Sequence, residues 1–178
     1  MVAAGDETTG VTVRNGKGLD CIDRRIIALL QVDATLSLVQ ISHAVGLSPS
    51  PCWKRIQRLE TEGIISARVA LVDPGAVGLG LTAYVAVEMA EHSEAELERF
   101  TQAVIAMPEV LELHRMAGDV DYLLKIAVAD TDAFTEFYRR LIVVGAIRKV
   151  TSRFAMERLK MTTALPIPAH PRGRSAGV

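Results

Sequence analysis

The sequence predicts an α+β protein with an N-terminal winged helix-turn-helix and a C-terminal ferredoxin-like βαββαβ domain. Apolar residues recur with helical spacing up to about residue 73, whereas strand-like alternation appears from residue 81 onward. Between them, Asp73-Pro74-Gly75, followed by Gly78 and Gly80, interrupts both patterns. We therefore expect five parts: a flexible arm at 1–18, the winged helix-turn-helix at 19–73, a linker at 74–80, the ferredoxin-like domain at 81–161 and a flexible tail at 162–178.

The composition is that of a folded protein, because 49% of the 178 residues are hydrophobic and 23% are charged. No apolar run approaches the roughly 18 residues needed to cross a membrane. Residues 1–18 also lack the charged start and apolar stretch of a secretory signal. We therefore expect a cytoplasmic protein without a membrane partner, in which Cys21 and Cys52 remain thiols. The net charge of −1 argues against bulk attraction to nucleic acid, although such a sum conceals local patches.

Two helices are predicted before residue 46. Asp20 can cap the first, whose apolar stripe recurs at helical spacing through Ile26. Ser37 and Gln40 form the S-x-x-Q capping box of the second helix, and Gly46 ends it in the left-handed conformation that glycine tolerates.

A third helix is predicted from Ser48, with Pro49 at its first position, to Gly63. The tight turn at 45–48 joins it to the second helix, as in a helix-turn-helix. Residues 64–72 are rich in β-branched and aliphatic side chains, so we expect either the strand of a small wing or the exit to the linker.

The third helix offers one face to a partner. Cys52, Ile56 and Leu59 point inward, and the other side is polar, with no acid between Ser48 and Gln57. A recognition helix meets DNA with such donors, and its N-terminus favours phosphate. The candidate DNA contacts are Ser48, Ser50, Pro51, Lys54, Arg55, Gln57 and Arg58. In the alternative interpretation this is an ordinary solvated face, with Glu60 and Glu62 as partners of its bases. Trp53 receives no assigned role.

The second half alternates strands with helices. Strands are predicted at 81–89, 110–116, 122–128 and 147–156. Ser93 and Glu96 suggest a capping box for the first intervening helix, and Thr131 can cap the second. This βαββαβ order is typical of a four-stranded antiparallel sheet with two helices on one face. The middle strands are apolar on both sides, so we expect the uncovered face to pack against a second copy of the chain.

Gly118-Asp119-Val120-Asp121-Tyr122 is the candidate small-ligand site. Its carboxylates can accept hydrogen bonds from an amino group, and backbone N–H groups at the turn can hold a carboxylate. An α-amino acid requires both. The alternative is a plain Gly-Asp turn without a ligand.

Taken together, these motifs resemble the Lrp/AsnC family of prokaryotic transcription factors over about residues 19–161. The resemblance is carried by four stretches, Leu19-Asp20-x-x-Asp23-Arg24-x-Ile26, residues 45–60, residues 118–124, and Thr151-Ser152-Arg153-Phe154-Ala155-Met156-Glu157. The segment Gly145-Ala146-Ile147 departs from the Pro-Gly-Val that the family often carries before the last strand.

The resemblance implies a regulator that binds promoter double-stranded DNA and senses an amino-acid effector through a domain that dimerises and assembles further, for instance to octamers. It implies that Gly118 and Asp121 are the leading candidates for effector contacts. Met116, Asp119 and Ser152 are the secondary candidates. We expect no cofactor.

Two other functions are considered. One is an architectural protein that compacts DNA without strong sequence preference, and the other is a ferredoxin-like enzyme whose helix-turn-helix makes only protein contacts. Against the enzyme, His43, His92 and His114 have no evident nucleophile or metal partner in the sequence, so we expect no catalytic residues and no metal site.

Overall fold

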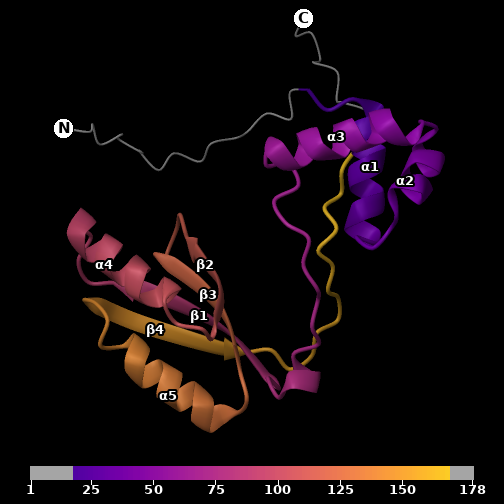
Figure 1. Ribbon diagram of the computed structural model, residues 1–178. Coiled ribbons are helices and arrows are strands. Elements are labelled where there is room, and N and C mark those ends of the chain that lie inside the picture. The colour runs from indigo at the N-terminus through magenta and orange to yellow at the C-terminus, as the bar shows by residue number, and fades with distance from the viewer. Residues whose placement is uncertain (1–17, 169–178) are drawn as a thin grey trace, which may run out of the picture. The chain divides into compact units, whose positions relative to one another are not determined.

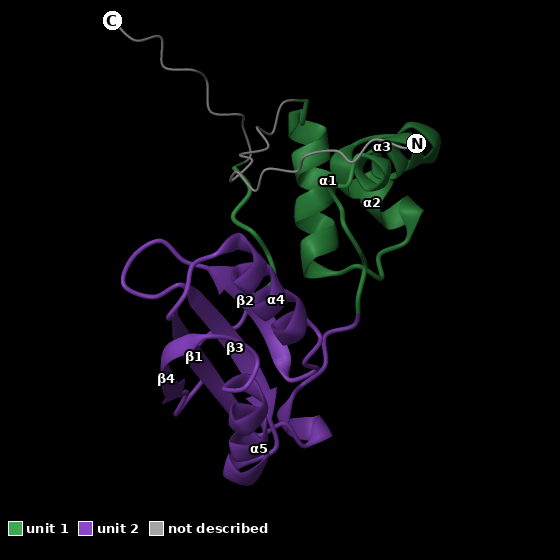
Figure 2. Ribbon diagram, turned by 90° about the vertical axis from the view of Figure 1, so that its left-hand side faces the viewer, with its two compact units in different colours: residues 1–69, 162–178 green, residues 70–161 purple. Residues whose placement is uncertain are grey.

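The computed structural model describes residues 18–168, which form parts of two compact units. One unit comprises residues 1–69 and 162–178 of the chain, and the other comprises residues 70–161 (Figure 2). The arm expected at the N-terminus lies, up to residue 17, outside the described residues, as do residues 169–178 of the expected tail.

The first unit is built on three helices, α1 (Cys21–Val32), α2 (Leu38–Val45) and α3 (Pro49–Thr61). The capping box of α2 is confirmed, because the Ser37 hydroxyl accepts from the Gln40 N–H while the Gln40 side chain accepts from the Ser37 N–H. Gly46 ends α2 at φ 73°, the left-handed conformation expected of it. Asp20 caps α1 in a second reciprocal pair, with Asp23 as its partner.

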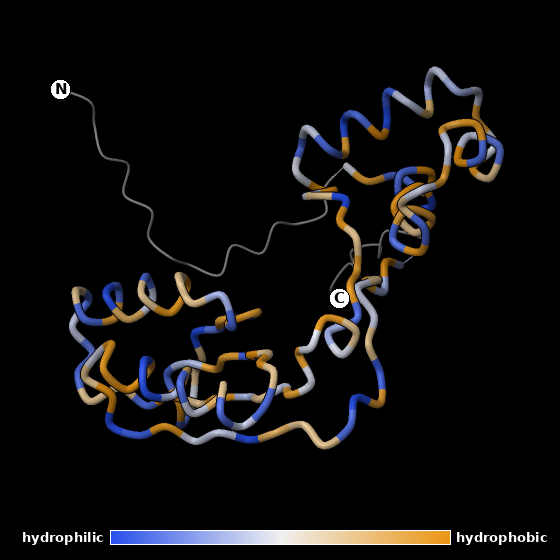
Figure 3. Tube along the Cα trace, turned by 60° about the horizontal axis from the view of Figure 1, so that its bottom comes forward, coloured by the Kyte–Doolittle hydropathy of each residue, from blue (hydrophilic) through white to orange (hydrophobic). Residues whose placement is uncertain are grey.

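All three helices contribute buried apolar residues to the core of this unit. Apolar and polar residues are interspersed along the trace (Figure 3). The inward orientation predicted for α3 is confirmed, because Cys52, Ile56 and Leu59 are buried. Since α2 has only 8 residues, its stability depends on this packing. The buried residues of this core are Ile26, Ile27, Leu30, Ile41, Val45, Cys52, Ile56 and Leu59.

The segment after α3 does not form a wing. Residues 64–73 contain no strand, and Ile65 packs against the helical core instead. A lone strand leaves its N–H and C=O groups unpaired, and the described part of this unit offers no second strand to pair with. The segment is therefore the exit to the linker, where Gly75–Val77 forms one 3₁₀ turn.

The second unit is an antiparallel sheet of four strands in the order β2-β3-β1-β4 (Figure 1). The strands and helices occur as β1 (Leu81–Met89), α4 (Glu94–Ile105), β2 (Val110–Arg115), β3 (Tyr122–Val128), α5 (Thr131–Leu141) and β4 (Ile147–Phe154). Phe100 of α4 and Phe137 of α5 share one buried core with Val85 and Val87 of β1, so both helices cover the same face. The predicted ferredoxin-like arrangement is confirmed.

Ser93 is the N-cap of α4 as predicted, but the predicted capping box with Glu96 is wrong, and so is the predicted cap of α5 at Thr131. The Ser93 hydroxyl donates to Glu91, and Glu96 accepts from the backbone N–H of Ala146 at 2.9 Å, so no capping box forms at α4. The N-cap of α5 is Asp130, whose carboxylate accepts two backbone N–H bonds of the first turn. A carboxylate one residue earlier thus takes the place expected for Thr131.

Candidate DNA interface and effector turn

The first turns of α3 present an exposed polar surface. Ser48 lies at the N-cap with an extended backbone and makes no side-chain cap hydrogen bond. The exposed residues of this surface, which we call the α3 surface, are Ser48, Ser50, Pro51, Lys54 and Gln57. Because no acid lies among them and the helix N-terminus carries partial positive charge, this surface favours an anionic partner. Five of the seven predicted DNA contacts are therefore accessible.

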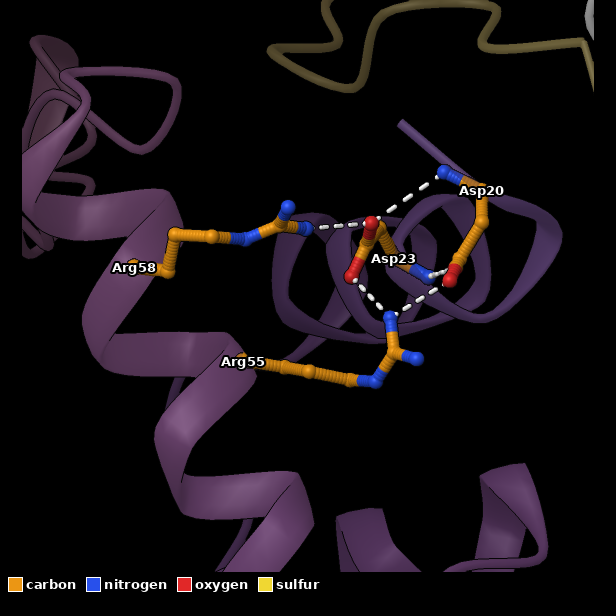
Figure 4. A network of polar contacts seen from close by, with 4 residues as sticks. All are labelled: Asp20, Asp23, Arg55 and Arg58. Atoms are coloured by element: carbon orange, nitrogen blue, oxygen red, sulfur yellow. Dashed lines mark hydrogen bonds and ion pairs between the residues drawn. The ribbon is translucent and has the colours of Figure 1, made fainter. Parts of the chain in front are cut away.

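The other two predicted contacts, Arg55 and Arg58, are half-buried and paired with Asp23 of α1 and with its N-cap Asp20 (Figure 4). Arg55 Nη1 donates to Asp20 Oδ2 at 2.6 Å and to Asp23 Oδ1 at 2.8 Å. Arg58 Nη2 donates to Asp23 Oδ2 at 2.5 Å. Asp23 is 0% exposed, so two half-buried guanidinium groups compensate one buried carboxylate. We call these four residues the α1–α3 ion-pair network.

Hydrogen bonding within this network shifts two pKa values. The hydrogen bonds that Arg55 donates to the carboxylate of Asp23, and secondly to that of Asp20, raise the pKa of Arg55. The backbone N–H of Asp23 lowers the pKa of Asp20, and Arg55 adds to this effect against the opposing effect of desolvation. Both groups thus remain charged, and the network holds α3 against α1.

Sequence reasoning missed the partners of these arginines. The alternative that paired them with Glu60 or Glu62 is not what the structure shows, because Glu60 accepts from Gln57 at 3.0 Å and from Arg68 at 2.7 Å. The available signal was the acid pair Asp20 and Asp23 at the start of α1.

A shallow groove of about 310 Å³ lies beside α3 and is bordered by α2 residues and by Trp53. Trp53 is 52% exposed, although it is a large apolar side chain. Its position beside Gln57 on the groove places the single tryptophan of the chain next to the α3 surface.

The candidate effector turn lies between β2 and β3. Met116 N donates to the carbonyl oxygen of Asp121 at 2.8 Å, which closes the turn. Gly118 has φ 140°, a conformation that side chains rarely adopt, so glycine is required there. Met116, Gly118 and Asp119 are exposed. The turn therefore presents backbone groups and one carboxylate to solvent.

Asp121 fastens this turn to the end of β1. Its Oδ2 accepts from Met89 N at 2.7 Å, and its Oδ1 lies 2.9 Å from His92 Nε2. Partial burial raises the pKa of the Asp121 carboxyl, but the hydrogen bonds from Met89 and His92 outweigh it, so this pKa lies below its ordinary value. His92 was not among the predicted site residues, and only its proximity in the fold identifies it.

Ser152 lies apart from the effector turn. It is half-buried on β4 opposite Val85, whereas the Asp121 N–H donates to the carbonyl of Val87 on β1 at 2.9 Å. Strand β1 lies between β3 and β4 in the sheet, so it separates the two predicted contacts within one chain. Met116, Gly118, Asp119 and Asp121 are brought together, and Ser152 is not one of this group.

Two further features bear on the class of protein. Among residues 18–168, no three His, Cys, Asp or Glu side chains are grouped so that they could hold a metal ion. In the same part of the chain, no helix is both long and apolar enough to cross a membrane.

Comparison with protein families identifies both halves of the chain. The AsnC-type helix-turn-helix domain matches residues 19–60, which include all three helices of the first unit up to the last turn of α3. The Lrp/AsnC ligand binding domain matches residues 82–165.

Characterised relatives are transcriptional regulators. The DNA-binding transcriptional activator DecR of Escherichia coli is 52% identical over 84% of this chain and 99% of its own length. The glutamate uptake regulatory protein of Zymomonas mobilis is 45% identical over 84% of this chain and 92% of its own length.

Solved structures agree with these relatives. The crystal structure of an AsnC family transcriptional regulator from Agrobacterium tumefaciens has a TM-score of 0.80 and 48% identity, covering 83% of this chain and 97% of that one. A transcriptional regulator from Neisseria meningitidis, solved in complex with L-Met, has a TM-score of 0.78 and 36% identity, covering 83% and 96% of the two chains. With both domains matched in order along the chain, this protein belongs to the Lrp/AsnC family of DNA-binding transcriptional regulators.

Proposed function

We propose that the protein binds double-stranded DNA through the α3 surface, and that an amino acid bound at the effector turn modulates its activity. The observation that carries the DNA half of this proposal is the exposed, acid-free start of α3. A helix of this kind enters the major groove with its N-terminal residues toward the base edges.

Within the α3 surface, side-chain chemistry suggests a division of roles. Lys54 enters none of the ion pairs among the described residues, so its ammonium is available to a phosphate or a guanine. Gln57 can read adenine, and the hydroxyls of Ser48 and Ser50 suit phosphate or base edges. Pro51 contributes an apolar contact surface without a competing N–H.

Arg55 and Arg58 combine two tasks in this proposal. A guanidinium has five N–H donors, and Arg58 uses Nη2 on Asp23, which leaves further donors for a phosphate. Their acids reduce the net charge that this part of α3 presents. They therefore contribute less to bulk attraction than Lys54 does and mainly hold the helix in place.

The effector half rests on the family domain and on the geometry of the turn. The Neisseria relative binds L-Met, which makes an α-amino acid the ligand class to test first. The exposed backbone at Gly118 would receive the ligand carboxylate, and Asp119 its ammonium group. Asp121 would shape the turn through Met89 and His92, and its remaining lone pairs stay available to the ligand.

The assembly proposed here is a homodimer that forms a higher oligomer, such as an octamer. The uncovered face of the sheet includes Tyr84, Ala86 and Leu123 on adjacent strands β1 and β3, where Ala86 and Leu123 are direct partners. This apolar strip favours a second copy of the sheet as its cover.

Two experiments test the function. In an electrophoretic mobility-shift titration against the upstream region of its own gene, Lys54→Ala/Gln57→Ala should weaken binding at least tenfold, while Thr61→Ala, at the far end of α3, should not. In a thermal-shift screen against the twenty amino acids, the effector should raise the melting temperature, because a ligand of the folded state stabilises it. Unchanged DNA binding by the double variant would contradict the role of α3, and no thermal shift would contradict the effector.

A further inference from the structure

The C-terminal segment at residues 162–168 lies on α1, although the sequence analysis expects a loose tail from residue 162. The Gln31 side-chain amide makes two bonds to Leu165, with Oε1 accepting from its N–H at 2.7 Å and Nε2 donating to its carbonyl at 3.3 Å. Arg24 Nη1 donates to the carbonyl of Pro168 at 3.4 Å. Ile167 packs against the apolar core of the helices. The helical unit is therefore assembled from both ends of the described chain.

The sequence of this segment suits docking. Pro166 and Pro168 restrict the backbone before binding and remove two N–H groups that would otherwise need partners. The N–H of Ile167 is satisfied inside the segment, because it donates to the carbonyl of Leu165 at 2.9 Å. Leu165 is left as the residue whose backbone Gln31 recognises, and Ile167 serves as the apolar anchor.

The chain thus joins the two units twice. It leaves the helical unit after residue 69 and returns to it at residue 162, after β4 has ended at Phe154. A unit held by one linker can rotate about that linker, whereas attachment at two separate points restricts rotation. Because the segment is part of the same chain, docking is intramolecular and requires only modest affinity.

We propose that the outer face of α1 is a docking site for the chain's own residues 162–168, and that docking fixes the orientation in which the helix-turn-helix meets DNA. This inference rests on the proposed DNA binding by a dimer. Two pre-oriented helical units bind two half-sites on one side of the duplex more tightly than two freely rotating units. Undocking should therefore affect binding to paired half-sites and spare binding to a single half-site.

The docking site is tested first by hydrogen exchange on the full-length chain. Gln31→Ala/Ile167→Ser should accelerate amide exchange in α1, since it removes both Leu165 bonds and the apolar anchor. Ile167→Val, which keeps an apolar anchor, should retain the wild-type protection. Unchanged exchange in the double variant would overturn the docking site.

The orienting role is tested with a duplex that the wild-type chain selects from a random pool, and with the same duplex carrying five extra base pairs between its half-sites. Five base pairs turn one half-site by about half a helical turn. The insertion should weaken wild-type binding at least tenfold. It should weaken binding by Gln31→Ala/Ile167→Ser by less than about threefold. A chain ending at Pro168 should behave as wild type, which separates docking from the charge of residues 169–178.

The outcomes are distinct. Equal spacing penalties for wild type and the double variant would overturn the orienting role. If the wild-type chain selects no site, the proposed function fails and the orienting role with it, while hydrogen exchange still decides whether the segment docks.

Discussion

Nη1 of Arg55 on α3 lies 2.8 Å from Oδ1 of Asp23 on α1, a carboxylate that is completely buried. The same nitrogen also donates to Asp20, so one side chain of α3 binds both acids of the α1 capping box. The residues that start α1 therefore also position α3. A change at α1, on the other side of the core, should reach DNA binding through this contact.

Asp23→Ala should destabilise the helical unit by about 2 kcal/mol, less than a fully buried pair would lose, because both arginines are partly exposed. The variant leaves two guanidinium groups without their shared acid and removes half of the α1 capping box. Urea unfolding followed by the fluorescence of Trp53, the single tryptophan, reports on this unit. Glu62→Gln, at an exposed acid of the α3 C-cap, is the matched control and should leave the midpoint unchanged. A wild-type midpoint for Asp23→Ala would show that the network does not stabilise the fold.

Lys54→Ala alone should lower the salt dependence of DNA binding, with the slope of log affinity against log salt falling by about 1. Arg58→Ala should lower it less, because Asp23 already neutralises part of that charge. The slopes of the two variants and of the wild type are compared by measuring DNA affinity at salt concentrations from about 50 to about 300 mM. A larger loss of slope in Arg58→Ala would mean that the ion pair opens on DNA.

Gly118→Ala should strain the effector turn by about 1 kcal/mol or more, because a side chain at φ 140° is unfavourable. Gly80→Ala is the comparison, since Gly80 is not at positive φ and a Cβ there would lie at an ordinary 3.4 Å from the carbonyl of Ala129. Calorimetry gives the stability of both variants. The amino acid found in the thermal-shift screen should then shift the melting temperature of Gly118→Ala less than that of Gly80→Ala.

Acid should loosen the effector turn through Asp121. Its pKa is depressed in the folded state, so its contribution to stability is complete above its ordinary value of 3.8 and is lost as pH falls through the lower, folded value. Asp121→Asn should therefore flatten the acid limb of stability below about pH 4. Circular dichroism during urea unfolding at pH 2.5, 4 and 7 measures this limb. An unchanged pH dependence in the variant would assign acid sensitivity to other carboxylates.

Local signals account for much of what the sequence predicted. Ser37, Gln40 and Gly46 act within one helix, so their spacing alone determines where α2 begins and ends. Ser93 and Glu96 have the same spacing, yet Glu96 accepts from the N–H of Ala146, 50 residues away. Long-range partners of this kind are set by the tertiary fold, and no pattern within a short window contains them.

The candidate site follows the same rule. The exposure of Lys54 and Gln57 could be predicted, because it follows from the helical periodicity of the apolar residues in the sequence. The pairing of Arg55 with Asp23 and that of Asp121 with His92 join residues 32 and 29 positions apart. The absence of a wing has a similar cause. The β-branched residues at 64–72 favour a strand only where a neighbouring strand exists to pair with, and a local pattern does not reveal whether there is one.

Gln31 and Leu165 are 134 residues apart, and this separation has a consequence for synthesis of the protein. The ribosome releases α1, α2 and α3 long before it translates the residues that cover α1. The helical unit therefore reaches its final state only after residues 162–168 have been translated, when the sheet has already been made. A fragment that stops after α3 would reproduce an early stage of biosynthesis, with the Gln31 amide and the site of Ile167 open to water. Its α1 amides would exchange faster than those of the 178-residue chain.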